Sequence, residues 1–485
     1  MAPSTNANES SPPKAYGVLH APSTGSSTQT RSVDELLTPD IRFVRVQYVD
    51  YVNVLRCRVL PASYFRKLYS DSGSRPGIAL AKIGLGIIGL MCAHGFGSTG
   101  EYLYVPDLSS WRVCTYAPGH ASVMGWFQEK VPHPRTGLTV DMCPRTLLAR
   151  LVREAKEKAG VSFLFGVESE FILMSATEPE PVFVNDFDWS SAAALRTGSV
   201  HSTVLEEIVT DLLAAGVEVE MYHAEAAPGQ YEVITGPLAP LEAADTLVFT
   251  RETIHNVANK HGLRATFAPR IPGHSCGSGA HTHVSVHGPA TGPRAADEAL
   301  APTLTPTERS FVQGLLAHLP AVCAFTLPTP ASYTRVEDGI WSGGTYAAWG
   351  TDNREVPVRL CGPAGHHHFE IKSVDASSTP HLALAALVGA GFRGITEGAL
   401  LTVGDCTKAV AQMSDQERAA VGLANGLRLP RTIADARRAL AEDEAMKEVL
   451  GLNFVQPYIA VNVMLEKFMQ GRDEKDTLKK LIDYS

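Results

Sequence analysis

Basic residues and long apolar runs are both scarce in this chain. Lys and Arg total 42 against 51 Asp and Glu, a net charge of −9 over 485 residues. A protein that neutralises nucleic-acid phosphates needs a basic surface, so this balance argues against a nucleic-acid binder. The most apolar stretch, 77–93, contains Lys82 and four glycines and is shorter than the roughly 20 apolar residues that span a bilayer. We therefore expect neither a nucleic-acid partner nor a membrane segment.

Cysteine pairs and a secretion signal are also absent. The eight cysteines are scattered and form no CxxC pair, which indicates reduced thiols instead of a disulfide framework. The first residues, MAPSTNANESSPPK, have no basic segment followed by an apolar one of the kind that directs secretion. Together these features predict a cytoplasmic protein. A hydrophobic content of 45% fits an ordinary globular chain.

Composition and periodicity divide the chain into three parts. Residues 1–35 are rich in Ser, Thr, Pro, Asn and Ala and predict a disordered tail. Residues 36–137 contain many glycines and strand-like runs, beginning with two strands in 41–60 joined by a turn near Asp50–Asn53, and predict a small sheet-rich domain. Residues 138–485 mix long helical patterns with hairpin-like strands. The fold class predicted is α+β, with helices packed on a mostly antiparallel sheet.

The larger part shows clear local periods. We expect strands at 161–174, 229–235, 281–287 and 367–373, and helices at 146–158, 203–215, 240–261, 307–319, 380–398 and 432–450. The pattern Gly84-x-Gly86-x-x-Gly89 matches a dinucleotide-binding motif, but three further glycines follow where the motif requires a helix. We interpret it as a glycine-rich loop.

Acidic residues inside apolar strands are the most informative feature. Glu168 and Glu170 lie two apart in FLFGVESEFILM, and alternation along a strand places both carboxylates on one face. Two like charges on a buried sheet need a compensating cation. The alternative is an edge strand with two solvated glutamates.

Three more segments carry residues of the same type. Glu225 and Glu232 flank the Pro228-Gly229 turn, which is equally compatible with solvated acids. His281, His283 and Ser285 alternate after a Gly-Ser-Gly approach; surface histidines are the alternative. Glu370 sits in a further strand-like run, and the preceding His366–His368 are interpreted as solvent-facing.

The joint pattern is more specific than its parts. Five glutamates (168, 170, 225, 232 and 370) and His281 could furnish neighbouring divalent sites, and such oxygen-rich ligation favours Mg²⁺ or Mn²⁺ over zinc. Arg335, Arg354 and Arg359 could bind carboxylate or phosphate oxygens, although each could equally form a surface ion pair. The combination suits phosphoryl transfer from a metal-bound nucleotide.

These segments together resemble the glutamine synthetase superfamily, in its type I-like branch. The matching pieces are GVESE (166–170), HAEAAPGQYEV (223–233), GSGAHTHVS (277–285), SYTR (332–335), NREVPVR (353–359) and FEIKSVDASSTPHLALAAL (369–387). The resemblance covers roughly Asp40 to the C-terminus and implies an N-terminal β-grasp domain and a catalytic domain with a curved sheet. It also implies stacked homo-oligomeric rings whose active sites are shared between subunits.

The resemblance further implies a role for each matching residue. Glu170, Glu225 and Glu232 would hold one metal, while Glu168, His281 and Glu370 would hold the ion that bridges the nucleotide phosphates, with two or three Mg²⁺ or Mn²⁺ per site. ATP would lie near His283, Ser285 and Arg359. Arg354 and Arg359 would stabilise the transferring phosphoryl group. Gly277, Arg335, Trp341 and Lys372 would face the small-molecule acid and amine substrates.

The sequence departs from the family at its substrate end. The stretch 91–107 lacks the family's DGSS motif, and Trp341 stands where the flap carries an acid. An ammonium site needs carboxylates, whereas Trp offers an apolar wall or a cation–π face. We therefore expect an ATP-dependent ligase that joins a carboxylate, first of all the γ-carboxylate of glutamate, to an organic amine. The alternatives are an ordinary glutamine synthetase with a displaced flap acid, such as Glu337 or Asp338, a ring-forming structural protein, and a metal-dependent γ-glutamyl amide hydrolase.

Overall fold

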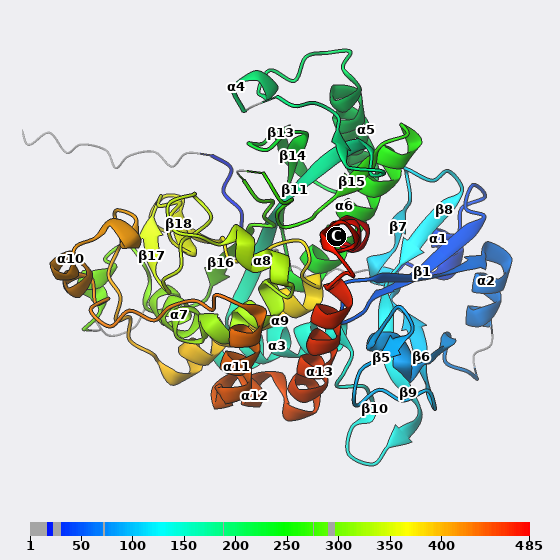
Figure 1. The fold of residues 1–485 in the computed structure, drawn as a ribbon. Helices are drawn as coiled ribbons and strands as arrows, with labels where there is room; N and C mark the ends of the chain where they lie inside the picture. The colour runs from blue at the N-terminus through cyan, green and yellow to red at the C-terminus, as the bar shows by residue number, and fades with distance from the viewer. Residues whose placement is uncertain (1–16, 23–30, 71–72, 188, 275, 290–295) are drawn as a thin grey trace, which may run out of the picture.

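The structure is a computed structural model that describes residues 17–22, 31–70, 73–187, 189–274, 276–289 and 296–485. It confirms the predicted α+β class. Two small N-terminal sheets lie beside a larger body built on one long sheet and its helices (Figure 1). The predicted tail falls mostly outside the described residues and stays a prediction, although a short helix, α1 (Val33–Leu36), already begins inside it.

The N-terminal part contains two four-stranded sheets, in the orders β2-β1-β8-β7 and β10-β9-β6-β3. The hairpin predicted in 41–60 is present, since β1 and β2 pair from Phe43↔Pro61 to Val49↔Leu55. Aromatic rings fill the space between the sheets because alternate strand positions face inward; Tyr48, Tyr104 and Phe127 form this cluster. The strands and helices of this part are β1 (Phe43–Val49), β2 (Leu55–Pro61), α2 (Ala62–Ser70), β3 (Ile78–Ala81), β4 (Ile87–Ile88), β5 (Met91–Cys92), β6 (Glu101–Pro106), β7 (Arg112–Val113), β8 (His120–Val123), β9 (Gly125–His133) and β10 (Gly137–Thr139).

The glycine motif forms a loop, as predicted. Residues 82–85 make one 3₁₀ turn and Ile87–Ile88 begin a two-residue hairpin, so no helix follows the glycines. A side chain at Gly86 would lie 2.4 Å from the ring of Phe96. The glycine is therefore explained by close packing and not by a bound pyrophosphate.

The β1–β2 turn joins the two parts of the molecule. Asn53, in a left-handed conformation with φ +62°, donates a side-chain hydrogen bond to the carbonyl of Ala376 at 2.8 Å. The hydroxyl of Thr379 donates to the carbonyl of Asp50 at 2.9 Å. Tyr51 packs its ring on Phe454. The N-terminal sheets are thus fixed to the segment that follows strand β19.

The larger part is organised around one sheet with the order β13-β14-β11-β16-β19-β18-β17, and β12 and β15 also pair with β11. Its pairing is antiparallel except between β17 and β18. Strand β11 is buried along most of its length, which explains its nearly continuous apolar sequence. The strands are β11 (Ser162–Ala176), β12 (Val182–Phe183), β13 (Val219–Ala224), β14 (Gln230–Leu238), β15 (Arg264–Thr266), β16 (Thr282–His287), β17 (Trp349–Thr351), β18 (Val358–Cys361) and β19 (His368–Ile371).

Helices cover this sheet, and α7 and α9 form its central helical pair (Figure 1). They approach closely because Gly314 on α7 meets Gly394 on α9. The helices are α3 (Pro144–Ala159), α4 (Trp189–Ala192), α5 (Val200–Ala214), α6 (Pro240–Lys260), α7 (Pro306–Thr326), α8 (Pro330–Arg335), α9 (Pro380–Glu397), α10 (Asp415–Ala420), α11 (Ile433–Glu442), α12 (Glu444–Leu450), α13 (Leu452–Met469) and α14 (Glu474–Tyr484).

The C-terminal helices differ from expectation. The single helix predicted at 432–450 is two helices, α11 and α12, because Asp443 caps α12 by accepting a hydrogen bond from the backbone N–H of Met446. Over the described ranges, no single helix has the length and apolar character needed to cross a bilayer. Only the bent pair α12–α13, with an angle of 106°, passes that test jointly.

Candidate metal and substrate site

The register of the central sheet brings distant acidic residues together. Across β11 and β14, Glu170 pairs with Glu232, and across β16 and β19, His283 pairs with Glu370. Strand β11 lies between β14 and β16, so residues from four strands converge on one face. The predicted shared face of Glu168 and Glu170 is present, because both carboxylates approach the same ring nitrogen of His281.

Glu168 is held between two histidines. Its Oε2 lies 2.9 Å from His281 Nδ1 and its Oε1 lies 3.0 Å from His283 Nε2. Burial opposes ionisation of this carboxyl, but the hydrogen bonds from the two rings hold its pKa well below the usual range. Glu168 therefore remains an anionic ligand at neutral pH.

Hydrogen bonds fix one carboxylate oxygen of Glu170, and the other oxygen faces the cluster. Oε2 accepts hydrogen bonds from the backbone N–H of Gly279 and from the side-chain amide of Gln230, each at 3.0 Å. Oε1 lies 3.5 Å from His281. Sequence reasoning did not single out Gln230, which positions this carboxylate from β14.

Glu225 and Glu232 share a histidine that sequence reasoning also missed. His223 lies 3.2 Å from Glu232 and 3.6 Å from Glu225. Its hydrogen bond with Glu232 raises the pKa of His223 to about 9. Burial raises the pKa of Glu232, and repulsion from Glu168 and Glu170 adds to the increase. The cluster therefore carries more negative charge than its own histidines neutralise.

Glu370 is neutralised from both sides. Arg359 on β18 donates to Oε2 and Lys372 donates to Oε1, both at 2.9 Å. Although burial works against the charged form, Lys372 and His281 lower the pKa of Glu370 to about 2. Lys372 is itself buried and points at this carboxylate, so the structure places it beside a predicted metal ligand.

These side chains fit a group of divalent cations. Three sets of possible ligand atoms lie within 4.8 Å of one another, and they are Glu168–His283–Glu370, Glu168–Glu232–His281 and His223–Glu225–Glu232. Carboxylate oxygens dominate each neighbourhood, as hard cations such as Mg²⁺ and Mn²⁺ prefer. The excess negative charge at Glu232 is the observation that supports this fit. The sets differ from the predicted division in two ways: His223 and His283 can also ligate, and Glu170 belongs to none of the three sets, although its Oε1 lies 3.5 Å from His281.

The predicted residues of the acid pocket lie next to this cluster. Arg335 on α8 is buried, and its Nη2 donates to the carbonyls of Lys372 and Val374 at 2.8 and 2.9 Å. Its Nε has no protein partner within the described residues. A side chain at Gly277 would lie 2.4 Å from Arg335, so only glycine allows this approach. The binding roles of both residues stay predictions.

The remaining predicted residues are not all brought to the cluster. Ser285 lies two residues after His283 on β16, and its hydroxyl is hydrogen-bonded to His287 at 2.8 Å. Arg354 is exposed. It takes part in none of the ion pairs found in the described part of the chain. The prediction that His366–His368 face solvent is wrong for His367, which is buried, and His368 lies on β19 with its ring 5.1 Å from that of His283.

The segment 336–345, here called the flap, follows α8. Trp341 is 63% exposed and has a left-handed backbone with φ +59°. Its backbone N–H donates to Glu355 at 2.7 Å, and that of Gly339 donates to the other oxygen of Glu355 at 2.9 Å. Asp338 accepts hydrogen bonds from the backbone and hydroxyl of Thr345. The flap therefore uses two nearby acids to fix its own conformation.

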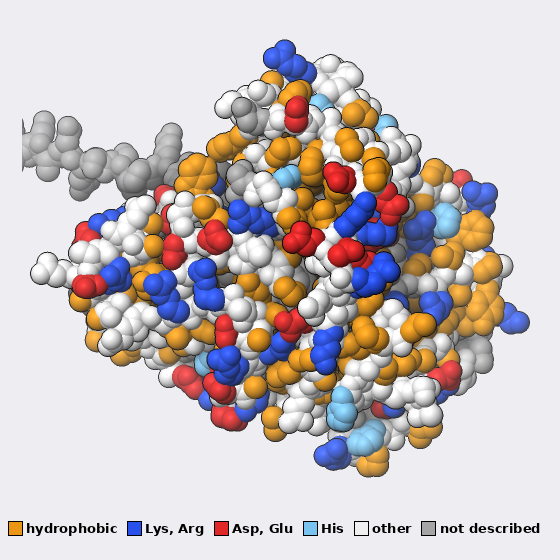
Figure 2. Space-filling view, viewed as in Figure 1, with side chains coloured by type: hydrophobic (Ala, Val, Ile, Leu, Met, Phe, Trp, Pro, Cys, Tyr) orange, Lys and Arg blue, Asp and Glu red, His pale blue; other side chains and the backbone are white. Residues whose placement is uncertain are grey.

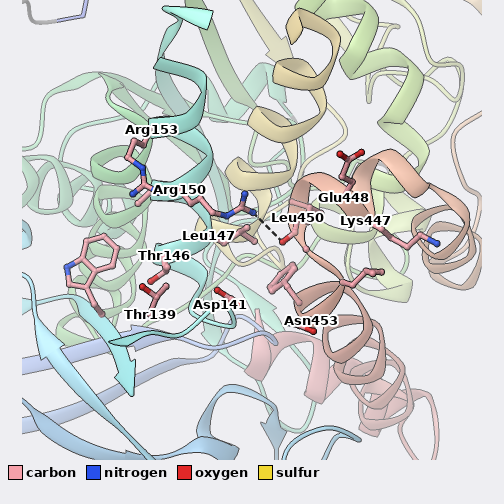
Figure 3. A pocket seen from close by; sticks show the side chains of 15 residues that line it. Thr139, Asp141, Thr146, Leu147, Arg150, Arg153, Lys447, Glu448, Leu450 and Asn453 are labelled. Carbon is pink, nitrogen blue, oxygen red and sulfur yellow. Dashed lines mark hydrogen bonds between the residues drawn. The ribbon is translucent and has the colours of Figure 1, made fainter. Parts of the chain in front are cut away.

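A sizeable cavity lies elsewhere. It has a volume of about 770 Å³ and is lined by α3 and by the junction of α12 and α13, where Arg150 donates to the carbonyl of Leu450 (Figure 3). None of its lining residues is a predicted site residue. On the face shown in Figure 2, acidic and basic side chains are interspersed, and hydrophobic ones gather over the N-terminal sheets.

Comparison with known proteins identifies what the chain resembles. The family model described as "Glutamine synthetase, catalytic domain" matches residues 141–475. Protein fluG of Emericella nidulans is 35% identical over 459 residues, which cover 92% of this chain but only 49% of fluG, so the chain spans about half the length of that relative. Gamma-glutamylpolyamine synthetase GlnA3 of Streptomyces coelicolor is 33% identical, over 91% of this chain and 93% of its own length. The crystal structure of a novel glutamine synthase homolog has a TM-score of 0.73 and 27% identity, over 93% of this chain and 99% of that one.

Proposed function

The chain belongs to the glutamine synthetase family, and on that premise we propose that it is an ATP-dependent ligase that joins a carboxylate to an organic amine. The observation that carries the proposal is the convergence of Glu168, Glu232, His281, His283 and Glu370, which form two sets that share Glu168 and whose ligand atoms lie within 4.8 Å of one another. The γ-carboxylate of glutamate is the proposed acid. The name of GlnA3, a relative that covers nearly the whole chain, supports γ-glutamyl transfer to an amine.

The reaction proceeds in two balanced steps. A carboxylate oxygen of the acid attacks the γ-phosphorus of ATP, the bond to the β-phosphate oxygen breaks, and ADP leaves, which yields an acyl phosphate. The amine nitrogen then attacks the acyl carbon, the carbon–oxygen bond breaks, phosphate leaves and the amine gives up a proton. Bound Mg²⁺ or Mn²⁺ would neutralise the phosphate oxygens and align them for transfer.

The chain's own residues supply the surroundings. The proposed ligands are Glu168, Glu225, Glu232, His281 and Glu370, with His223 beside them, and Glu170, which faces His281. Arg359, whose hydrogen bond to Glu370 supports a position beside the ligand set, is the proposed partner of the phosphate oxygens. Arg335 has an unpartnered Nε that could receive a substrate carboxylate. These roles are proposals that rest on contacts within the site.

The flap favours an organic amine over ammonium. The position of the family's flap acid is occupied by an exposed tryptophan, and the neighbouring Asp338 and Glu355 are engaged by Thr345 and by the flap backbone. Glu337 is the exception, since it is 46% exposed and lies 3.9 Å from Arg270. Because Glu337 could serve as a displaced flap acid, ordinary glutamine synthesis with ammonium is the second candidate function.

We also propose a homo-oligomer. Leu90 and Met91, at the tip of the β4–β5 hairpin, are fully and 40% exposed, and Val59 on edge strand β2 is 51% exposed. Exposed apolar groups gathered on one part of a surface mark interaction sites. A ring of like subunits would cover them.

One assay tests the function. Purified protein is incubated with Mg²⁺ or Mn²⁺, ATP, glutamate and either ammonium or one of a panel of amines, and phosphate and the product mass are measured. Phosphate and a γ-glutamyl amide formed only with organic amines support the proposal, whereas equal turnover with ammonium supports the second candidate. Loss of a γ-glutamyl amide without ATP would indicate a hydrolase, and inactivity under every condition would contradict an enzyme.

A further inference from the structure

Two exposed tryptophans from distant parts of the chain meet at the flap. Trp189 on α4 is 50% exposed and Trp341 on the flap is 63% exposed. Their ring centroids are 6.4 Å apart and the rings meet edge to face, with an interplanar angle of 60°. Large aromatic side chains are seldom left this exposed in pairs unless they contact something else.

Each tryptophan lies on a segment that is fixed to a different strand of the central sheet. Four residues before Trp189, Asn185 donates to the hydroxyl of Tyr231, which precedes Glu232, and accepts from the backbone of Gly229. On the other side, the space above Gly343 of the flap is closed by Lys372, which bonds to Glu370. The tryptophan pair therefore links the segment around Asn185, anchored at the start of β14, to the flap, which packs on Lys372.

Further apolar side chains lie close to the two tryptophans in the sequence. Phe187 is 43% exposed and Ile340 is 38% exposed, and each lies within two residues of one of the tryptophans. Two acids of the flap region are engaged, since Asp338 bonds to Thr345 and Glu355 to the flap backbone. Glu337, which is 46% exposed, and Asp186, which is exposed beside Phe187, are the rim carboxylates that a polyamine would need.

We propose that Trp189 and Trp341 bind the body of the amine substrate, and that this body is apolar, as in an alkylamine or arylalkylamine. The inference rests on the proposed ligase function and names its amine class. Ring faces and edges attract hydrocarbon and aromatic groups, while a single ammonium group enters toward the acidic cluster. Glu355 is a positioning residue, because its two hydrogen bonds hold Trp341 in a left-handed conformation that non-glycine residues rarely adopt.

The test compares amines that differ in the group attached to the reacting nitrogen. Wild-type protein is assayed with Mn²⁺, ATP and glutamate against ammonium, hexylamine, phenethylamine, putrescine and spermidine. Hexylamine and phenethylamine are expected to give kcat/KM at least 10-fold above putrescine and spermidine. A preference for putrescine or spermidine overturns the apolar class while it leaves the ligase intact, and turnover with ammonium alone overturns both.

Variants test whether the tryptophans affect amine binding without affecting the binding of ATP and glutamate. Trp189→Ala and Trp341→Ala should each raise the KM for phenethylamine about 10-fold, with the KM values for ATP and glutamate within two-fold of wild type. Trp341→Phe should restore most of the affinity, and Glu355→Ala should raise the amine KM more than Glu355→Gln does. Tyr64→Ala, which removes a similarly exposed aromatic ring from α2, is the matched control and should leave every KM unchanged.

A binding measurement needs no turnover. Phenethylamine added without ATP should quench the tryptophan fluorescence of the wild type, and the quench should shrink in Trp189→Phe and in Trp341→Phe. If both alanine variants keep the wild-type amine KM and both phenylalanine variants keep the quench, the tryptophan pair does not bind the amine.

Discussion

The buried ion pair between Arg145 and Asp245 makes the sharpest stability prediction. Asp245 on α6 accepts from Arg145 Nε at 3.0 Å and from Nη2 at 2.6 Å, and it lies 2.8 Å from His381 on α9. Arg145 also reaches Asp107, just after β6 of the N-terminal part, at 3.0 Å. The network thus joins helices α3, α6 and α9 to the N-terminal sheets.

Replacing Asp245 by alanine leaves Arg145 as a buried charge with one remaining carboxylate. Removing one partner of a buried pair typically costs about 3–5 kcal/mol. The pKa gives a second figure, because Arg145 and His381 overcome burial and lower the pKa of Asp245 from 3.8 to about 2. That shift corresponds to roughly 2.5 kcal/mol of stability at neutral pH. Both routes predict a loss of a few kcal/mol.

The sign of the pH dependence follows from the lowered pKa. The contribution of Asp245 is fully present above its unfolded pKa of 3.8 and is lost as the pH falls through about 2. Urea denaturation followed by circular dichroism should therefore show a constant gap between wild type and Asp245→Ala from pH 7 to 5, and a smaller gap below pH 4. The double variant Arg145→Met/Asp245→Asn removes the charge pair and should lose less than Asp245→Ala. A loss under about 1 kcal/mol at pH 7, or a gap that does not change with pH, would refute the reasoning.

Three further predictions concern the site and the core. Glu170→Gln should abolish most of the rise in melting temperature that Mn²⁺ gives the wild type, a gain worth about 2.7 kcal/mol at 100 times Kd; an unchanged rise would exclude Glu170 as a ligand. Gly394→Ala places a methyl group 2.2 Å from the carbonyl oxygen of Ser310, so it should cost about 1–3 kcal/mol in chemical denaturation, and wild-type stability would contradict the close helix contact. Trp341→Glu restores an acid to the flap and should raise kcat/KM for ammonium relative to phenethylamine, whereas an unchanged ratio would contradict the role of the flap.

The acidic cluster was predictable because it depends on local rules. Strand alternation alone places Glu168 and Glu170 on one face, and the Pro228-Gly229 turn predicts the strand that carries Glu232. His223 was missed. An antiparallel hairpin around the turn pairs His223 with Glu232, as the structure shows. Counting across the predicted Pro228-Gly229 turn would instead have paired Glu225 with Glu232, because the observed hairpin is centred one residue earlier.

The C-terminal helices and the flap contacts could not be predicted from the sequence. The apolar period of 432–450 continues through Asp443, whose capping contact and ion pair with His318 of α7 depend on tertiary packing. Helix α13 contains Pro457, which argues against a helix when only the sequence is considered. Similarly, Glu355 bonds to the flap 14 and 16 residues earlier, and no local pattern predicts which acid is used in this way.

Lys372 provides a test that distinguishes substrate binding from metal-site structure. Its ammonium and the guanidinium of Arg359 occupy the two oxygens of Glu370, each at 2.9 Å. A divalent cation that binds Glu370 must therefore compete with Lys372 for Oε1. Once displaced, the ammonium group would be free to bind the carboxylate of the acid substrate, as the resemblance to the family implies.

Replacing Lys372 by methionine should then weaken the binding of glutamate without weakening the binding of Mn²⁺. The KM for glutamate should rise about 10-fold or more, because a charge-assisted hydrogen bond is lost. The affinity for Mn²⁺, measured by calorimetry without substrates, should stay the same or increase, because a competing cation is gone. Lys372→Gln keeps a hydrogen-bond donor but no charge. Its KM for glutamate should lie between those of the wild type and of Lys372→Met. If methionine weakens Mn²⁺ and glutamate binding together, Lys372 supports the shape of the metal site and does not compete for it.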